Sequence, residues 1–500
     1  IMSKIYKGLI ALATLVVASQ NMAAYDFAAE NEDGVTIYYN AISDSEAEVT
    51  SGGPGYSGDV NIPASVTHND ITYSVTSIGD FVFFSAQTLT SVTIPESITK
   101  IGEGAFAFSP ALRTVYFNAE NCATMGSRNM AAFQECNKIT NVYFGDKVRI
   151  IPDLAFTMCG SLESITLPET VTYIGRYAFA FTGISSVTIP DAVTTIGGAA
   201  FSGSTNISAF YGKFASDDNR SLIIGDKLIN VAPNGLSSYS VPASVTTIGE
   251  YAFLNCEALT SVTLTESVTA IEEGAFSGCV RIGNVDLPET ITTIAKYAFS
   301  YCSYLKSMTI PEAVTTIGEG AFFSCTNLKA FYGKYASDDN RCLIKDNTLI
   351  SIAPKGLTTF IIPSSTTTVG SLAFLNCTLL TEVVIPESVT SIEYCAFYFC
   401  TGLEKIQCDN PTPPTLGSEV FSGVKAASCV LVVPDGTIDA YRAADQWSNF
   451  VNISGLETIA ADSDSNACYY DLRGIRMSAP LAPGLYIRRS GSKSDKVLIK

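Results

Sequence analysis

A short pattern of hydrophobic and polar positions repeats along most of the chain with a period of about 23 residues. Its most regular marker is a Phe that usually follows an Ala. Two steps between successive markers, Phe201 to Phe253 and Phe322 to Phe374, are 52 residues long. Such a fixed period predicts an array of stacked structural repeats. The markers are Phe83, Phe106, Phe133, Phe156, Phe179, Phe201, Phe253, Phe276, Phe299, Phe322, Phe374, Phe397 and Phe421.

Each repeat opens with a strand. In residues 259–264, apolar Val262 and Leu264 alternate with polar Thr263, which predicts one buried and one exposed face. A Pro follows the strand in many repeats and ends it, because Pro lacks the N–H that a sheet ladder needs. The next apolar pair, such as Ile98 and Ile101, predicts a short extended arm. We attribute the bend after this arm to the conformational freedom of the Gly that follows it.

The Ala-Phe pair then carries the largest side chain of the repeat. One coil cannot bury that Phe alone, but stacked coils bury a row of them about 4.8 Å apart, at roughly 1.5–3 kcal/mol each. The predicted fold is therefore a repeat solenoid: a right-handed β-solenoid with parallel strands, about 23 residues per coil, capped at both ends.

Both 52-residue steps contain the same additional segment, at residues 210–233 and 331–354. In each, two apolar runs surround a turn dipeptide, Gly225-Asp226 or Asp346-Asn347, which predicts a β-hairpin. The repeat decays at both ends, and a short helix is expected at residues 437–447. The predicted organisation is a signal peptide (1–24), an N-terminal β cap (25–75), a solenoid with the two hairpins (76–408), a capping region (409–460) and a short β tail (461–500).

The N-terminus indicates export. Lys4 and Lys7 precede an apolar run at residues 8–18, followed by small residues to Ala24, as in a secretory signal peptide. The run is too short to span a bilayer, and no later stretch is long and apolar enough to do so. We expect an extracellular or outer-cell-surface protein with no membrane span. Its formal charge of -18 repels phosphate backbones, so nucleic acid is not an expected partner.

A ladder of cysteines follows the Phe markers at a constant offset of three residues. Equivalent positions in stacked coils project in parallel, which disfavours disulfides, so we expect buried thiols. Cys395 with Cys400, and Cys408 with Cys429, remain alternatives. No metal site is expected, since no Cys-x-x-Cys pair and only one His occur. The ladder is Cys136, Cys159, Cys256, Cys279, Cys302, Cys325, Cys377 and Cys400.

No catalytic constellation emerges, and no cofactor is expected. His68, the single histidine, falls in a predicted N-terminal turn without the partners that a catalytic His needs. Glu residues recur at the bend after Pro and predict a solvated rim, although a glycosidase pair about 5–9.5 Å apart is not excluded by sequence. Residues 217–219 and 338–340, each Asp-Asp-Asn, lack the ligand spacing of a calcium loop and predict self-capped turns. We therefore expect a non-enzyme.

The exposed strand positions carry the candidate binding residues. Thr is common there and is an ordinary strand residue, so an unused sheet surface is one interpretation. The tyrosines differ, because Tyr and Arg are enriched at binding hot spots. The outward row is Thr93, Tyr116, Tyr143, Thr166, Thr188, Tyr211, Ser240, Thr263, Asp286, Thr309, Tyr332 and Ile361. The binding candidates are Tyr116, Tyr143, Arg113, Asn141, Tyr211 and Tyr332.

The repeat, with its Ile-Pro, Ile-Gly, Ala-Phe and Cys positions over about residues 75–408, closely resembles the BspA-like leucine-rich-repeat family of Bacteroides-group surface proteins. The resemblance implies secretion, surface display and, for some members, adhesion to host proteins or other cells. The final segment, with Tyr-Asp-Leu-Arg-Gly at residues 470–474 and Gly-Leu-Tyr-Ile at 484–487, looks like the C-terminal tails of exported proteins of that group. The tail resemblance implies a role in outer-membrane sorting; a small β cap is the alternative.

The expected function is therefore adhesion or protein–protein interaction by a non-catalytic exported or cell-surface leucine-rich-repeat protein. Two alternatives stay open. A glycan-binding surface protein would use the exposed tyrosines, and a structural, self-associating protein would use the solenoid ends or the acidic rim. The sequence does not identify the protein or glycan partner or the oligomeric state.

Overall fold

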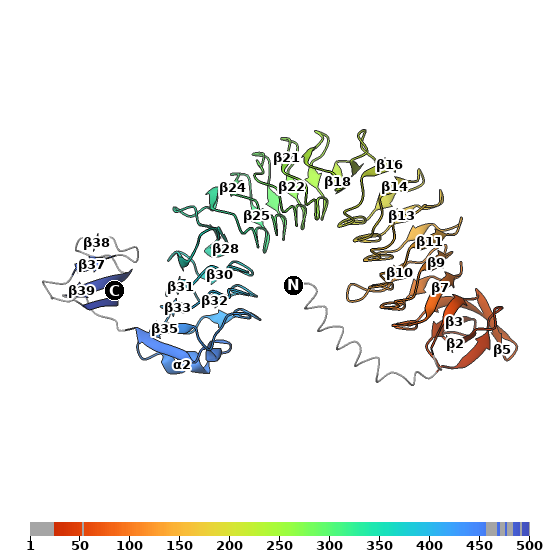
Figure 1. The fold of residues 1–500 in the computed structure, drawn as a ribbon, viewed down its shortest axis with the longest axis horizontal. Helices are drawn as coiled ribbons and strands as arrows, with labels where there is room; N and C mark the ends of the chain where they lie inside the picture. The colour runs from red at the N-terminus through yellow and green to blue at the C-terminus, as the bar shows by residue number, and fades with distance from the viewer. Residues whose placement is uncertain are drawn as a thin grey trace. The chain divides into compact units, whose positions relative to one another are not determined.

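The computed structural model describes residues 25–52, 55–456, 468–470, 476–477, 484–490 and 493–499. The proposed signal peptide lies outside these residues. The chain divides into two compact units, one ending at Cys279 and one beginning at Val280. Each unit contains stacked coils with parallel strands (Figure 1). The predicted parallel β-solenoid with roughly 23 residues per turn is confirmed.

An N-terminal sheet begins the first unit. It is built from β1 (Phe27–Glu30), β2 (Thr36–Ala41), β3 (Glu46–Thr50), β5 (Ser65–His68) and β6 (Ile71–Ile78). The pairs β1–β2, β2–β3 and β5–β6 are antiparallel, whereas β3 and β6 are parallel. Their inward side chains are buried, so this sheet covers the apolar end of the coil stack. The ring of His68 stacks on Phe27 with centroids 4.6 Å apart.

Most coils of the first unit contribute a longer outer strand and a two-residue arm. The outer strands form three groups: β4 (Gly58–Asn61), β7 (Leu89–Ile94), β9 (Thr114–Phe117) and β11 (Asn141–Phe144); β14 (Ser186–Ile189) and β16 (Ala209–Gly212); β19 (Ser238–Ser240) and β21 (Ser261–Thr263). The arms are β8 (Lys100–Ile101), β10 (Thr124–Met125), β12 (Ile150–Ile151), β13 (Tyr173–Ile174), β15 (Thr195–Ile196), β20 (Thr247–Ile248) and β22 (Ala270–Ile271).

The prediction of a strand in every coil is wrong in two places. Residues 163–167 and 284–287 have no strand assignment, although their apolar and polar positions match those of the other coils. Thr166 and Asp286 of the predicted outward row are nevertheless exposed. In the first unit the outer sheet is therefore interrupted between β11 and β14.

The two predicted hairpins are present as β17 (Ser221–Ile224) with β18 (Lys227–Val231), and β27 (Cys342–Lys345) with β28 (Thr348–Ile352). The Asp-Asp-Asn turns before them are self-capped as expected: Asp218 Oδ1 accepts hydrogen bonds from Ser216 Oγ at 2.6 Å and from the Arg220 backbone N–H at 3.0 Å. The Arg220 guanidinium donates to the carbonyls of Ser208 and Ala232, which fixes the hairpin base to its neighbouring segments.

The second unit repeats the coil plan. Its outer strands are β24 (Ser307–Ile310), β26 (Ala330–Gly333), β29 (Thr359–Ile361), β31 (Glu382–Ile385), β33 (Lys405–Cys408), β35 (Val430–Pro434) and β36 (Asn452–Leu456). Its arms are β23 (Thr293–Ile294), β25 (Thr316–Ile317), β30 (Thr368–Val369), β32 (Ser391–Ile392) and β34 (Thr415–Leu416).

Aromatic side chains close the second unit. The predicted helix is shorter than expected: α2 spans Ile438–Ala443, and a 3-10 turn follows at Trp447–Asn449. Trp447 and Phe450 are buried, each with its ring centroid 5.1 Å from that of Phe421. Gln446 accepts the Val420 N–H and donates to the Gly417 carbonyl, so it satisfies backbone groups that the next coil would otherwise pair.

The described residues of the tail form strands. They are β37 (Cys468–Tyr470), β38 (Arg476–Met477), β39 (Gly484–Ser490) and β40 (Lys493–Ile499), joined antiparallel in the order β38-β37-β39-β40. Within the described segments, none of the helices has the length and apolar character needed to cross a membrane.

The predicted Phe row forms the core. Phe106 is fully buried, and its ring is stacked between those of Phe83 and Phe133 at centroid distances of 4.7 and 4.6 Å. The backbone joins the coils on the same side, since the Phe106 N–H donates to the Ala132 carbonyl at 2.8 Å. Coil stacking therefore provides both the apolar contact and the hydrogen bonds.

The bend after each arm has a different cause from the one expected. Gly175 does not have a positive φ; the left-handed residue is Tyr177, with φ 57. A Cβ on Gly175 would clash with the backbone nitrogen of Asp153. Gly is required there because the preceding coil passes so close, and not because the bend needs a special backbone conformation.

The cysteine ladder is buried as predicted. Several of its thiols also make a hydrogen bond to the preceding coil: Cys136 Sγ donates to the Phe106 carbonyl at 3.0 Å, and Cys279 Sγ to the Phe253 carbonyl at 3.2 Å. Ser204 occupies the same position and donates to the Phe179 carbonyl at 2.9 Å. A small side chain that can donate a hydrogen bond, Cys or Ser, therefore suits this position. The alternative disulfide partners, Cys395, Cys400, Cys408 and Cys429, all have reduced thiols in the structure.

Candidate functional site

Two of the predicted binding residues lie together on the outer strand face of the first unit. Tyr116 in β9 and Tyr143 in β11 are direct partners in the parallel register. Their rings stack with centroids 5.2 Å apart and planes 20° apart. Both rings face solvent, with 42% of Tyr116 and 53% of Tyr143 exposed. The two tyrosines form one aromatic surface, which we call the tyrosine pair.

The strands hold this pair rigidly. Val115 and Val142, which precede the two tyrosines, point inward and are buried, because side chains alternate along a strand. The carbonyl of Arg113 accepts the Asn141 N–H at 3.1 Å, which sets the register at the start of the two strands. The pair therefore sits on a preformed surface and not on a loop.

Arg113 and Asn141 lie at the same end of the pair, and both are exposed. The Arg113 guanidinium makes no ion pair or hydrogen bond with any described residue. The Asn141 side chain donates to Thr140 Oγ1 at 3.0 Å. A cation and an amide are thus available beside the two rings.

The other two predicted tyrosines stand alone. Tyr211 in β16 and Tyr332 in β26 are each 45% exposed, but their register partners are Thr188 and Thr309. They occupy the same outward strand position as the tyrosine pair, but neither has an aromatic register partner. They therefore serve as natural single-tyrosine controls for it.

A hollow that the sequence did not reveal adjoins the pair. It has a volume of about 320 Å³ and lies between β11 and the unpaired segment of the next coil. Tyr143 and Asp146 line it on one side, and Ser164, Thr166 and Pro168 on the other. Residues 164–168 have the same alternation of apolar and polar positions as their paired counterparts in other coils. The signal that could have marked the interruption is Leu before the Pro, at Leu167 and again at Leu287 in the other segment without a strand, where paired strands have β-branched Ile or Val.

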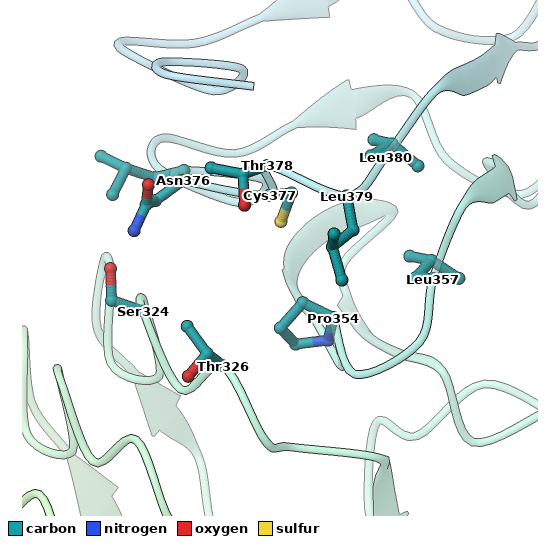
Figure 2. Close-up of a pocket in the computed structure, with 10 residues that line it drawn as sticks. Ser324, Thr326, Pro354, Leu357, Asn376, Cys377, Thr378, Leu379 and Leu380 are labelled. Atoms are coloured by element: carbon teal, nitrogen blue, oxygen red, sulfur yellow. The ribbon is translucent and has the colours of Figure 1, made fainter. Parts of the chain in front are cut away.

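A second, smaller cavity lies in the second unit beside the hairpin β27–β28. Its volume is about 60 Å³, room for only a few water molecules. Figure 2 shows Leu357, Leu379 and Pro354 along one part of its wall and Ser324 and Asn376 along another. Ser324 Oγ is buried without a hydrogen-bond partner among the described residues. The cavity is too small for a substrate of ordinary size.

The buried thiols of the coils are held in their neutral form. Desolvation inside the coil stack raises the pKa of the Cys136 and Cys325 thiols to about 12 and keeps them protonated near neutral pH. His68, the one histidine, is packed against Phe27 in the N-terminal sheet. Within the described residues, no three His, Cys, Asp or Glu side chains gather in a way that could hold a metal ion.

A comparison with protein-family models assigns the family of the repeat. A family model for the BspA type leucine rich repeat region matches in six copies, over residues 63–131, 230–337 and 353–438, which together make up more than half of the chain. A comparison with curated proteins found no match.

Several solved structures are similar to this chain. A leucine rich cell surface protein from Faecalibacterium prausnitzii is 26% identical, with a TM-score of 0.46 and coverage of 77% of this chain and 95% of that one. The pneumococcal vaccine antigen PcpA is 17% identical, with a TM-score of 0.48 and coverage of 87% and 98%. A leucine-rich repeat protein from Bacteroides ovatus is 23% identical, with a TM-score of 0.29 and coverage of 87% and 100%.

Proposed function

We propose that this chain, which belongs to the family of BspA-type leucine-rich-repeat proteins, is a non-catalytic binding protein that holds a partner protein on the outer strand face of its first unit. The observation that carries the proposal is the exposed, stacked pair of Tyr116 and Tyr143. Arg113 and Asn141 supply polar contacts beside it, whereas the single tyrosines Tyr211 and Tyr332, which have Thr as register partner, are not needed for this contact.

The chemistry of the pair supports protein binding. Exposed tyrosines gain little from core burial, so their rings are available to a partner. A Tyr on a rigid strand loses little side-chain entropy on binding, which makes it an effective anchor. An Arg beside the rings adds a charged donor that suits acidic or carbonyl groups of a protein surface.

The proposed setting is outside the cell. The cationic start, apolar run and small residues of the first 24 residues are typical of an export signal. We place the mature protein at the outer cell surface, where adhesion to proteins of a host or of other cells is its proposed role. The tail at residues 461–500 is proposed to act in outer-membrane sorting.

A binding panel tests the proposal. The chain from Tyr25 onward is immobilised and offered extracellular-matrix and secreted proteins, and in parallel an array of glycans. The expected result is saturable binding of at least one protein that Tyr116→Thr with Tyr143→Thr weakens by about tenfold or more. The matched control is Tyr332→Thr, which removes an equally exposed but unstacked ring. Binding of glycans alone, or protein binding that the double variant leaves unchanged, would overturn the proposal.

A further inference from the structure

The hollow beside the tyrosine pair exposes the edge of a strand within the first unit. β11 is the terminal strand of the sheet β11-β9-β7-β4. The N–H groups of Asn141 and Gly145 donate to the Arg113 and Phe117 carbonyls in the preceding coil. In a parallel ladder alternate residues bond to opposite sides, so the N–H groups of Val142 and Phe144 face the next coil.

The next coil does not use this edge. Residues 163–167 are not in a strand, and no hydrogen bond joins the backbone of Val142 or Phe144 to any described residue. In the other direction this segment is attached through the Glu163 carbonyl, which accepts the Ser185 N–H and, at 3.5 Å, the Ser185 hydroxyl. The strand edge thus opens into the hollow of about 320 Å³.

We propose that this edge binds an extended peptide segment of the partner protein, which adds to β11 as a further strand; this inference rests on the proposed function and specifies its partner chemistry. Unpaired strand edges are templates for such addition. The four residues of β11 offer an edge of roughly 13 Å. A peptide backbone presents N–H and C=O groups at the spacing that this edge requires, whereas a sugar ring does not.

The lining of the hollow adds side-chain specificity. Tyr143 forms part of the wall, so a peptide side chain beside it would extend the stacked row that begins at Tyr116. Asp146 lines the hollow and makes no ion pair with a described residue. The segment that binds therefore carries an aromatic or other apolar residue for Tyr143 and a Lys or Arg for Asp146.

The test uses a phage-displayed library of short peptides selected on the chain from Tyr25 onward. We expect enriched peptides that share an apolar residue and a basic residue. Methylating the backbone nitrogens of the best peptide one at a time should weaken binding by about tenfold or more at alternate residues, since only every second N–H of an added strand faces β11. The proposal would be overturned if no peptide is enriched, or if methylation weakens peptide binding in a pattern that does not alternate along the peptide.

A variant that fills the hollow separates this inference from the proposed function. Thr166→Trp should weaken peptide binding by about tenfold or more, and Thr263→Trp, the equivalent exposed position in β21, should leave it unchanged. Circular dichroism and the melting temperature of both variants check that they fold. If Thr166→Trp leaves binding of the peptide and of the panel's protein partner intact while the tyrosine double variant weakens the partner, the strand-addition inference fails and the proposed function stands. If the tyrosine double variant also leaves the partner bound, both fail.

Discussion

Removing one ring from the Phe row should destabilise the first unit by a large and localised amount. Phe106 is fully buried and stacks on Phe83 and Phe133 at 4.7 and 4.6 Å. A buried Phe→Ala change costs about 3–5 kcal/mol through lost transfer energy and the cavity that remains. The lost aromatic pairs add to this, at about 0.5–1.5 kcal/mol each. The coil cannot collapse freely into the space, because hydrogen bonds hold its backbone to both neighbours.

We therefore expect Phe106→Ala to lower the free energy of unfolding by about 4–8 kcal/mol. Phe106→Leu, which keeps most of the volume, should cost about 1–2 kcal/mol. Tyr304→Ala, at a residue that is 60% exposed, should change stability by no more than about 0.5 kcal/mol.

Chemical denaturation of the chain from Tyr25 onward gives these free energies, and amide hydrogen exchange locates the effect. Because coils in a solenoid contact mainly their nearest neighbours, the increase in exchange rate should be greatest in residues 83–133. A loss of less than about 1 kcal/mol for Phe106→Ala would refute the reasoning, since the ring would then not belong to the core.

Other predictions concern the cysteines and glycines. Cys279→Ser keeps a donor to the Phe253 carbonyl in the preceding coil and should cost less than Cys279→Ala. The Ala variant loses this hydrogen bond, worth about 0.5–1.5 kcal/mol, while the carbonyl still accepts the Cys256 N–H. Denaturant midpoints compare the two variants. Gly318→Ala should destabilise the protein by about 1–3 kcal/mol, because the added Cβ would clash with the backbone nitrogen of Lys296. A Cβ on Gly283 would have no atom within 4 Å, so Gly283→Ala should not destabilise it. Melting temperatures of the two variants test this difference. Burial raises the pKa of Cys136 and Cys325 from 9.0 to about 12, so the stability that the neutral thiols contribute is complete below about pH 9 and is lost as the pH rises from about 9 to about 12. Stability measured against pH should fall in that window, and less steeply when both residues are replaced by Ala. Mass spectrometry after alkylation of denatured, unreduced protein should find the ladder cysteines reduced; disulfides between consecutive members would contradict the parallel geometry.

The period of the chain predicted most of the fold, because it reports a contact that every coil makes. The marker Phe and the inward Val positions follow from the burial of one apolar row, and the hairpins were predicted from the turn dipeptides Gly225-Asp226 and Asp346-Asn347. The stacking of Tyr116 on Tyr143 was predictable for the same reason, since equivalent positions in adjacent parallel strands lie side by side.

The features that escaped prediction depend on distances between coils. A repeat pattern does not show that Gly175 touches the preceding backbone, or that a bulky residue such as Tyr177 takes the left-handed conformation. It also does not reveal where two coils separate. The apolar and polar positions around Thr166 alternate as in its paired counterparts, yet its segment leaves the edge of β11 open. The hollow next to the tyrosine pair was therefore visible only in three dimensions.

The most direct test of the proposed binding surface is amide hydrogen–deuterium exchange of the chain from Tyr25 onward, alone and saturated with the protein partner that the panel identifies. If the partner binds the tyrosine pair, exchange should slow at residues 113–117 and 140–146, and residues 330–333 around the single Tyr332 should change much less. Protection confined to other regions, such as the hairpins at residues 221–231 and 342–352, with no change at residues 140–146, would contradict the proposal.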